Sequence, residues 1–375
     1  MKKFLALALA SVMAVSLVAC GSTNADTNAE SSAAATTTAA TAATAATAES
    51  SSEEPGLKIA IVSSPSGVDD GSFNQDNYNG VLKFIEENPN ATVTPIREET
   101  GDSAAAVQAV ADVVADYDVI VCCGFQFAGI GNLAQENPDT KFILIDSWPT
   151  VDGTEVTADQ VIDNVYAAYY AEQESGFYAG MAAALSTTTG KVAVVNGIAY
   201  PSNVNYQYGF ECGVKYVNGT EGMNVEVVEL PSYAGTDVTG ANVGGNYVGN
   251  FSDEATGKVL GNALIAEGVK VIGCDVDQYD DGANGDSNIV LTSGLKVMHD
   301  TVYNVLNEVK DGSFKGANVT LTAADDATGF VSEEGRCQLT AEAIEKINAA
   351  QALLKEGKIV PAANFNGVTP ETFTW

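Results

Sequence analysis

The sequence predicts an α/β protein made of two lobes, each built around a parallel sheet. From Leu57 almost to the end of the chain, short apolar runs alternate with longer amphipathic stretches. This order is typical of parallel strands joined by crossover helices. The runs are apolar throughout rather than at every second residue, as expected for strands that are buried on both faces. About 320 residues follow the N-terminal tract, which is enough for two lobes with separate cores.

The first lobe is expected to contain residues 56–163 together with about 292–325. Its predicted elements are, in chain order, the strand Leu57–Val62, the helix Asn74–Glu87, the strand Thr92–Pro95, the helix Ser103–Ala115, the strand Val119–Cys123 and the strand Phe142–Asp146.

The second lobe is expected to contain residues 164–291 together with about 326–375. The elements predicted from this point onward are a long helix from Asn164 to Leu185, the strand Lys191–Val195, the helix Tyr206–Val217, the strand Val225–Leu230, the helix Asp253–Glu267, the strand Val269–Cys274, the helix Lys296–Asp311 and the helix Thr340–Lys355.

The N-terminus predicts export and a lipid anchor. Lys2 and Lys3 precede the apolar run Phe4–Val18, which is too short to span a membrane but suits an export signal. Because Leu-Val-Ala-Cys-Gly ends the run, residues 1–19 are interpreted as a lipoprotein signal peptide, cut before Cys20. The alternative is a plain secretory signal in which Cys20 is incidental. Either way, the protein is expected on the extracytoplasmic side, and with acylated Cys20 it is held at the cell membrane.

Residues 20–55 are expected to form the lipidated cysteine and a flexible tether. Residues 22–54 are mostly Ala, Thr, Ser, Asn and Glu, with no aromatic and no large aliphatic side chain. Such a tract cannot bury enough apolar surface to offset the entropy lost on ordering.

Composition excludes several classes of function. The chain has 17 Lys+Arg against 49 Asp+Glu, a formal charge of -32, so nucleic acid is not expected as a partner. Five cysteines follow Cys20, an odd number with an adjacent pair, which predicts free and largely buried thiols. The single histidine, His299, is interpreted as a surface residue of a helix. No metal site, no cofactor and no histidine-dependent nucleophile is therefore expected.

Polar and aromatic side chains follow the predicted strands. In open parallel sheets the loops beyond the carboxyl ends of the strands build the ligand site. The loops contain Ser63–Gln75 after the first strand, Gly124–Phe127 after Cys123, Asp146 after Ile145, and Cys274–Gln278 after Gly273. Aromatic rings, carboxylates and amides are thus expected to surround a polar, planar ligand.

Six segments in and beside these loops resemble the corresponding segments of a known protein family. They are Val68–Gln75 (VDDGSFNQ), Gly124-Phe125 with Asn137–Phe142 (NPDTKF), Gly176–Gly180 (GFYAG), Gly249–Asp253 (GNFSD) with Gly257-Lys258, Asp275–Gln278 (DVDQ) and Leu291–Lys296 (LTSGLK). In this order they resemble the basic membrane protein family, nucleoside-binding lipoproteins that deliver substrate to ABC importers. The resemblance implies a type I periplasmic-binding fold, with two lobes joined by three crossovers that close on a purine nucleoside and present it to an ABC permease.

The resemblance also implies residues for the base. Phe73, with Phe251 from the facing lobe, is expected to sandwich the base, while Asn74 and Asp146 hydrogen-bond its edge. Phe73 has an alternative role as a hydrophobic staple of the first helix, and Asp146 as a partner of a helix N-terminus. Tyr206 is left out of the stack.

Asp275 and Lys296 are expected at the sugar. Asp275 can accept from two ribose hydroxyls, and Lys296 can donate to the sugar while balancing that carboxylate. The alternative for Lys296 is a solvated residue that opens a helix. Asp70 is interpreted only as an acceptor at the N-terminus of the first helix.

One departure from the family pattern predicts a shortened second lobe. The helix containing Lys258 is followed directly by the strand that ends at Asp275, where the family has a further strand and helix. The Gly-rich insertion Ser232–Tyr247, with Tyr233, Asn242 and Asn246, is a candidate to replace part of that unit.

Three other functions remain open at this point. The acidic residues also suit a receptor for another polar metabolite, such as a sugar or an autoinducer-like compound. Ser293 and Lys296 match the Ser-x-x-Lys of penicillin-recognising acyl enzymes, without the Lys-Thr-Gly or Ser-Asp-Asn that accompany it. A surface lipoprotein that signals or adheres after losing transport is the third alternative.

Overall fold

The computed structural model describes residues 56–375 except 252, 267–270 and 365–366. The described residues belong to one compact unit, Glu54–Trp375. The predicted signal peptide, Cys20 and the tether lie outside the described residues. None of the helices in the described part of the chain has both the length and the apolar character needed to cross a membrane.

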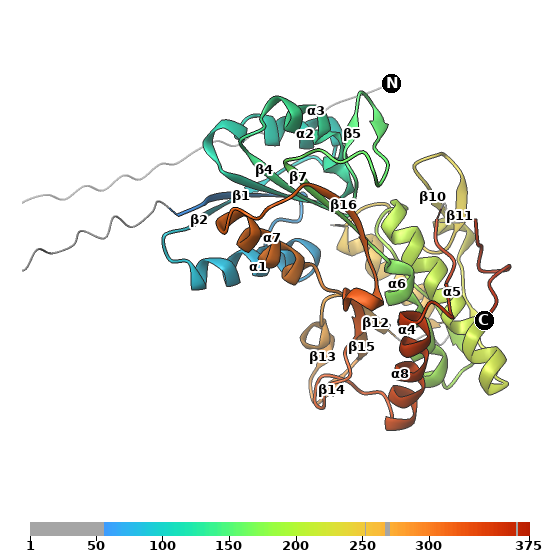
Figure 1. Cartoon of the computed structure of the whole chain (residues 1–375). Coiled ribbons are helices and arrows are strands. Elements are labelled where there is room, and N and C mark those ends of the chain that lie inside the picture. The colour runs from blue at the N-terminus through green and yellow to red at the C-terminus, as the bar shows by residue number, and fades with distance from the viewer. Residues whose placement is uncertain (1–55, 252, 267–270, 365–366) are drawn as a thin grey trace, which may run out of the picture. The chain divides into compact units, whose positions relative to one another are not determined.

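The first lobe is a three-layer sandwich around a six-stranded parallel sheet (Figure 1). The strand order is β16-β7-β4-β3-β1-β2. The strands are β1 (Lys58–Ser63), β2 (Thr92–Arg97), β3 (Val119–Cys123), β4 (Lys141–Ile145), β7 (Val165–Tyr170) and β16 (Ala317–Leu321). The helices are α1 (Phe73–Glu87), α2 (Ser103–Ala111), α3 (Gly131–Glu136) and α7 (Met298–Lys310). A short antiparallel ribbon, β5 (Thr150–Val151) with β6 (Thr154–Glu155), is attached to it.

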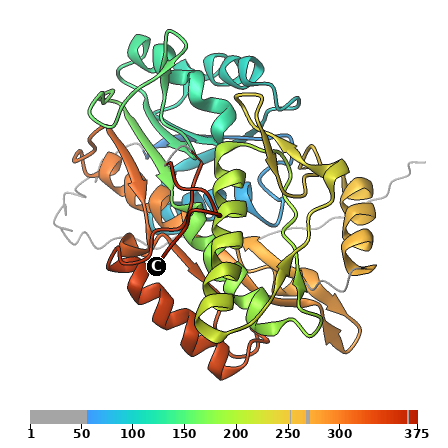
Figure 2. The same ribbon diagram turned by 90° about the vertical axis from the view of Figure 1, so that its right-hand side faces the viewer.

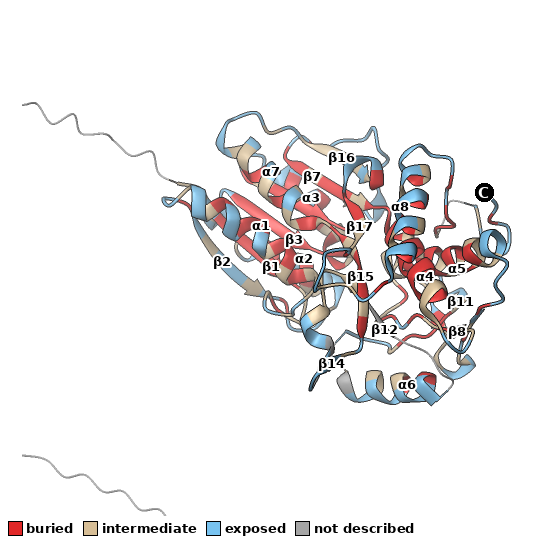
Figure 3. Ribbon diagram, turned by 90° about the horizontal axis from the view of Figure 1, so that it is seen from below, coloured by how far each residue is buried: buried red, intermediate tan, exposed pale blue. Residues whose placement is uncertain are grey.

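Alternate residues of these strands enter two separate cores. Ile59 and Ile61 of β1 face α1 and α7, whereas Ala60 and Val62 face α2 and its neighbours. Both faces of the central strands are therefore buried, as Figure 3 shows in red, which explains their continuous apolar sequences.

The strand β7 was not predicted, because the sequence analysis placed a helix from Asn164 onward. Val165–Tyr170 instead pairs in parallel with β4 on one side and β16 on the other. The β-branched and aromatic residues Val165, Tyr166, Tyr169 and Tyr170 suit a strand, and tertiary pairing overrides the helical propensity of Ala167 and Ala168. The boundary of the first lobe accordingly lies at Ala171 rather than at residue 163.

The strand β15 (Val290–Lys296) corrects a second boundary. Residues from about 292 and a helix beginning at Lys296 were assigned to the first lobe, but β15 pairs with β12 (Val271–Asp275) and β17 (Thr328–Phe330) in the second. The chain crosses between the lobes at Ala171, at Val297 and through residues 322–327, which gives the three crossovers that were predicted.

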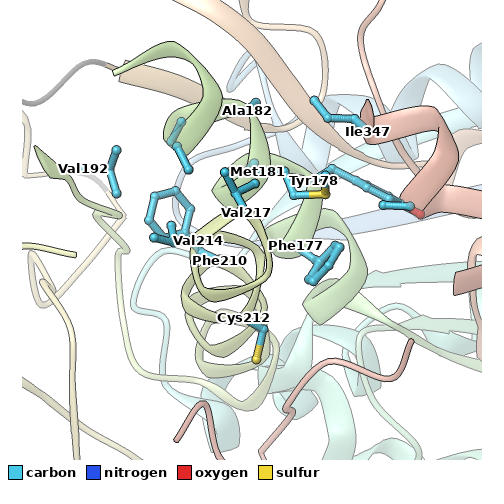
Figure 4. Packing of buried hydrophobic residues seen from close by; sticks show 14 of the residues in the cluster. Phe177, Tyr178, Met181, Ala182, Val192, Phe210, Cys212, Val214, Val217 and Ile347 are labelled. Atoms are coloured by element: carbon cyan, nitrogen blue, oxygen red, sulfur yellow. The ribbon is translucent and has the colours of Figure 1, made fainter. Parts of the chain in front are cut away.

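The second lobe is built around two closely packed helices, α4 (Glu172–Ser186) and α5 (Pro201–Glu221). Each carries a Gly-x-x-x-Gly sequence, Gly176–Gly180 in α4 and Gly209–Gly213 in α5. A Cβ atom at any of these four glycines would overlap a backbone carbonyl of the other helix. Above this contact Phe177, Tyr178 and Met181 pack with residues of α5 such as Phe210 (Figure 4).

The strands of the second lobe form two sheets rather than one. One sheet has the order β12-β15-β17, and the other pairs β8 (Lys191–Val192) with β9 (Glu226–Val227) in parallel. Within the described residues, no strand joins β8 to β12. Helix α6 (Glu254–Ala266) packs beside β9 through Leu260 and Leu264, and the ribbon of β13 (Ala283–Asn284) and β14 (Ser287–Asn288) lies between β12 and β15 in the chain.

The Gly-rich insertion is an interruption of one strand, not a replacement for the missing unit. Val192 pairs with Val227, 35 residues later, whereas Asn196 bridges to Tyr247, 51 residues later. Sixteen residues have therefore been inserted before the chain returns to the same edge. They carry the ribbon of β10 (Gly235–Thr236) and β11 (Asn242–Gly244). Asn246 closes the break, because its side chain bonds to the backbone of Val194, Val228 and Leu230.

The C-terminal part of the chain completes the second lobe. The helix predicted from Thr340 to Lys355 is α8 (Ala341–Lys355), and the Thr340 side chain caps it by accepting a hydrogen bond from the Ala343 N–H. Figure 2 shows the dark red tail beside α5. The Lys215 ammonium of α5 donates to the carbonyls of Pro370, Glu371 and Phe373 at 3.0, 2.7 and 3.0 Å.

We expect Gly209→Ala to destabilise the protein by about 1–3 kcal/mol, because the new methyl group meets the backbone carbonyl of Gln173. The matched control is Gly261→Ala in α6, where the added Cβ has open space. Alanine there should be neutral or stabilising by up to about 1 kcal/mol. Denaturant unfolding of both variants measures the difference, and equal stabilities would contradict the close crossing of α4 and α5.

Candidate ligand-binding site

A cavity of about 560 Å³ lies between the two lobes, within the range typical of small-molecule sites. All six residues proposed from the sequence line it: Phe73, Asn74, Asp146, Phe251, Asp275 and Lys296. They come from loops at the carboxyl ends of β1, β4 and β12, from the end of β15 and from the segment before α6. The parallel sheets therefore bring together residues that are far apart in the chain.

Asp146 and Asp275 occupy matching positions in the two lobes. Asp146 follows β4 and Asp275 ends β12, and both have left-handed backbones, with φ of 63° and 66°. Non-glycine residues rarely adopt this conformation, although aspartate tolerates it better than most. Backbone strain of this kind gathers at functional sites. In each lobe it turns a carboxylate into the cavity at the point where the strand stops.

The ammonium of Lys296 holds this cluster together. Its Nζ lies 2.8 Å from Asp146, 3.7 Å from Glu172 and 3.8 Å from Asp275. Burial alone would lower the pKa of Lys296, but the three carboxylates outweigh it and keep the pKa raised. Lys296 is the last residue of a strand and is 4% exposed, so its interpretation as a solvated helix residue is wrong. Asp146 likewise pairs with Lys296 rather than with a helix N-terminus.

Glu172 is a charged residue of the cavity wall that was not predicted from the sequence. It is the first residue of α4, directly after β7, and is 3% exposed. One carboxylate oxygen accepts a 3.1 Å hydrogen bond from Asn205, and the other has no hydrogen-bond partner in the described part of the chain. Burial raises the pKa of Glu172 to about 7, although Lys296 opposes that shift. Because the sequence predicts a helix across residues 164–185, it does not reveal that a strand ends just before Glu172.

The loop before α1 is held by Asp70. Its carboxylate accepts from the backbone N–H groups of Ser72, Asn74 and Gln75, which confirms it as an acceptor at the helix N-terminus. It also accepts from the Asn74 side chain at 2.7 Å, and the second Asn74 N–H donates to Ser64. Asn74 therefore cannot donate to a ligand in this arrangement. One lone pair of its carbonyl oxygen remains available.

Aromatic rings line the cavity on several sides. The Phe73 ring lies 4.8 Å from the Lys296 ammonium. At the mouth, the Phe125 ring of the first lobe lies 5.4 Å from that of Tyr200, which in turn lies 6.0 Å from Phe251. Phe251 is 54% exposed and its ring contacts that of Tyr200, whereas Tyr206 is buried in the cavity wall. Tyr206, omitted from the predicted stack, is thus the more enclosed aromatic of the second lobe.

Ser293 does not form a catalytic pair with Lys296, so the acyl-enzyme alternative is wrong. Both residues lie in β15, three positions apart, and side chains at that spacing point to opposite faces of a strand. The Ser293 hydroxyl is fully buried and accepts from the Gln278 N–H at 3.0 Å. Lys296 is already bonded to Asp146.

Comparisons with known proteins agree on one family. The family model Bmp, described as ABC transporter substrate-binding protein PnrA-like, matches residues 57–238. The chain is 28% identical to the ABC transporter nucleoside-binding protein BmpA of Lactococcus lactis, over 81% of this chain and 88% of BmpA. It is also 23% identical to an uncharacterized lipoprotein of Pyrococcus abyssi, over 76% of this chain and 72% of the relative.

A solved structure shows the same fold. It is that of an ABC transporter system solute-binding protein from Aeropyrum pernix K1, with a TM-score of 0.66 and 20% identity, covering 83% of this chain and 94% of the other. This likeness agrees with the predicted type I periplasmic-binding architecture.

Replacing Lys296 by Met should destabilise the protein by about 3–5 kcal/mol, because the buried carboxylates lose the one cation that lies near them among the described residues. The pKa values of Glu172 and Asp275, which burial already raises, then rise further above their unfolded values. The folded state binds more protons, so the stability lost should grow as pH rises from 5 to 8. Thermal unfolding of both proteins at the two pH values measures this.

The control for this substitution is Lys310→Met at the end of α7. Lys310 is exposed, and its Nζ lies 3.8 Å from a carboxylate oxygen of Asp311. Its removal should change stability by less than about 1 kcal/mol at either pH. If Lys296→Met loses no more stability than Lys310→Met, or loses the same amount at both pH values, the assigned charge cluster is contradicted.

Proposed function

Because the chain belongs to the Bmp family of PnrA-like ABC transporter substrate-binding proteins, we propose that its lobes close on a purine nucleoside and present it to the permease of an ABC importer. Binding proteins of this architecture work by hinge motion between lobes. Such a function needs no catalytic group.

The observation that best supports the proposal is the order of side-chain types along the cavity, an aromatic ring followed by charged groups. Phe73 offers an aromatic face, and the carboxylates of Asp146 and Asp275 flank Lys296 next to it. A base stacked on Phe73 gains roughly 1–3 kcal/mol from the ring. Its sugar then lies within reach of Asp275 and Lys296, which supply an acceptor for two hydroxyls and a donor. One oxygen of Asp146 has no hydrogen-bond partner among the described residues and is available to an N–H of the base.

The second face of the base is assigned to Tyr206 rather than to Phe251. Tyr206 is 6% exposed and belongs to the cavity wall, so its ring excludes water from a stacked ligand. Phe251 is more than half exposed and rests on Tyr200. We assign Phe251 to the mouth of the cavity.

The receptor is proposed to be tethered to the extracytoplasmic face of the membrane through acylated Cys20. The sequence around Cys20 and the lipoprotein relative from Pyrococcus abyssi support this. Two or more acyl chains hold a protein on a membrane far more firmly than one.

Isothermal titration calorimetry with adenosine, guanosine, inosine and uridine tests the ligand. We expect residues 56–375 to bind a purine nucleoside, and both Phe73→Ala and Asp275→Ala to weaken that binding at least tenfold, because one removes stacking and the other a charged acceptor. Circular dichroism controls for folding. No binding of any nucleoside by the folded protein would overturn the proposal, and binding of a sugar instead would support the alternative receptor.

The anchor has a separate test. The full chain expressed in a bacterial host should enter the membrane fraction and incorporate labelled fatty acid, whereas Cys20→Ala should do neither, since it lacks the thiol that is acylated. An unlabelled wild-type protein released into the medium would instead indicate a plain secretory signal.

A further inference from the structure

Glu172 presents an unmet hydrogen-bond acceptor to the cavity. Among the described residues its Oε1 has no hydrogen-bond partner, and the nearest of their cations, Lys296 Nζ, is 3.7 Å away. The side chain is 4% exposed, so water has little access to that oxygen. A buried acceptor left unpaired costs free energy comparable to a lost hydrogen bond, and more when it is charged. The position is therefore poised to receive a donor from a ligand.

The orientation of Glu172 is fixed on its other side. Asn205 donates to Oε2 at 3.1 Å, and the Asn205 carbonyl oxygen accepts the Asn364 N–H at 2.7 Å. The close crossing of α4 and α5 sets the distance between Glu172 and Asn205. The unpartnered Oε1 is thus held beside Lys296 rather than free to turn away.

The charge around Lys296 selects the kind of group that fits. Three carboxylates surround one ammonium, so a further negative charge at this place is disfavoured. A hydroxyl group, which donates a hydrogen bond without adding charge, is favoured. The phosphate of a nucleotide is the opposite case, since it adds negative charge and acceptors only.

Glu172 and Asp275 lie at nearly equal distances from Lys296, 3.7 and 3.8 Å. In the proposed pose Asp275 takes the 2′- and 3′-hydroxyls of the sugar, which leaves the 5′-hydroxyl as the remaining donor at this end of the cavity. We propose that Glu172 accepts a hydrogen bond from the 5′-hydroxyl and makes the site select nucleosides over their 5′-phosphates and 5′-deoxy analogues. This inference rests on the nucleoside function proposed above.

The test is a double-mutant cycle between the protein and the ligand, measured by calorimetry. At pH 8, above the pKa of about 7 of Glu172, the carboxylate is mostly ionised. Wild type should then bind 5′-deoxyadenosine about 10- to 100-fold more weakly than adenosine, because a hydrogen bond to a charged acceptor is lost. Adenosine 5′-monophosphate should bind more weakly still. In Glu172→Ala the ratio between adenosine and 5′-deoxyadenosine should fall close to one, while the preference for adenosine over 2′-deoxyadenosine should persist. If guanosine is the tighter nucleoside, the guanosine series replaces this one.

Two variants separate recognition from a structural effect. Glu172→Gln keeps the shape and volume of the side chain, so it covers the case in which Glu172→Ala fails to fold, and it should relax the exclusion of the monophosphate. Glu174→Gln, two residues along α4, changes a buried carboxylate that bonds to Ala323 and Thr328 and does not line the cavity. It should lower stability without changing the ratios between ligands.

The outcomes are distinct. Equal binding of adenosine and 5′-deoxyadenosine by wild type, or an unchanged ratio in Glu172→Ala, overturns the role of Glu172 while leaving nucleoside binding in place. Equal weakening of every ligand by Glu172→Ala would mean that Glu172 only balances Lys296. Absence of binding by any nucleoside overturns the proposed function itself, and this inference with it.

Discussion

The ion pairs of the buried Lys296 ammonium are the interactions on which the rest of the cavity depends. The ammonium meets one carboxylate from each lobe, Asp146 and Asp275, and one from the first crossover, Glu172. Separating the lobes would break these contacts, and water that enters the gap would have to replace them. The cluster therefore links ligand recognition to the relation between the lobes. It also explains why two aspartates keep strained backbones at the ends of their strands.

The four glycines of α4 and α5 allow the close helix contact that positions Glu172 in this charge cluster. Their backbone-to-backbone contact fixes where α4 begins, at Glu172, and where the early turns of α5 carry Asn205 and Tyr206. Small residues allow two helices to approach more closely than larger ones would. A shift of either helix would disturb the hydrogen bond between Glu172 and Asn205 as well as the apolar core. The ligand cavity and the core of the second lobe thus share one packing constraint.

Much of this could be predicted from sequence, and the failures have identifiable causes. Continuous apolar runs such as Val119–Cys123 gave strands, and the polar residues that follow them do line one cavity. The prediction failed at Val165–Tyr170 and Val290–Lys296, where small or polar residues weaken the strand pattern and only pairing with distant strands decides the structure. Glu172 was missed for the same reason, since its role follows from a strand end. The commitment of the Asn74 amide to Ser64 and Asp70 depends on three-dimensional contacts that spacing cannot reveal.

The break in the sheet of the second lobe leaves most of the binding site intact, because of where the break lies. Within the described residues, the break in the sheet falls between β8 and β12. Asp275 and Lys296 lie on the other side of it, in strands that pair with each other, and α4 packs against both strands. Glu172 and Tyr206 stand on the α4 and α5 pair, whose contact does not use the broken sheet. Of the proposed site residues, Phe251 lies on the segment that continues the interrupted strand. The groups assigned to the base edge and the sugar are therefore held by elements that the break in the sheet does not affect. The break affects only the segment that carries Phe251, at the mouth of the cavity.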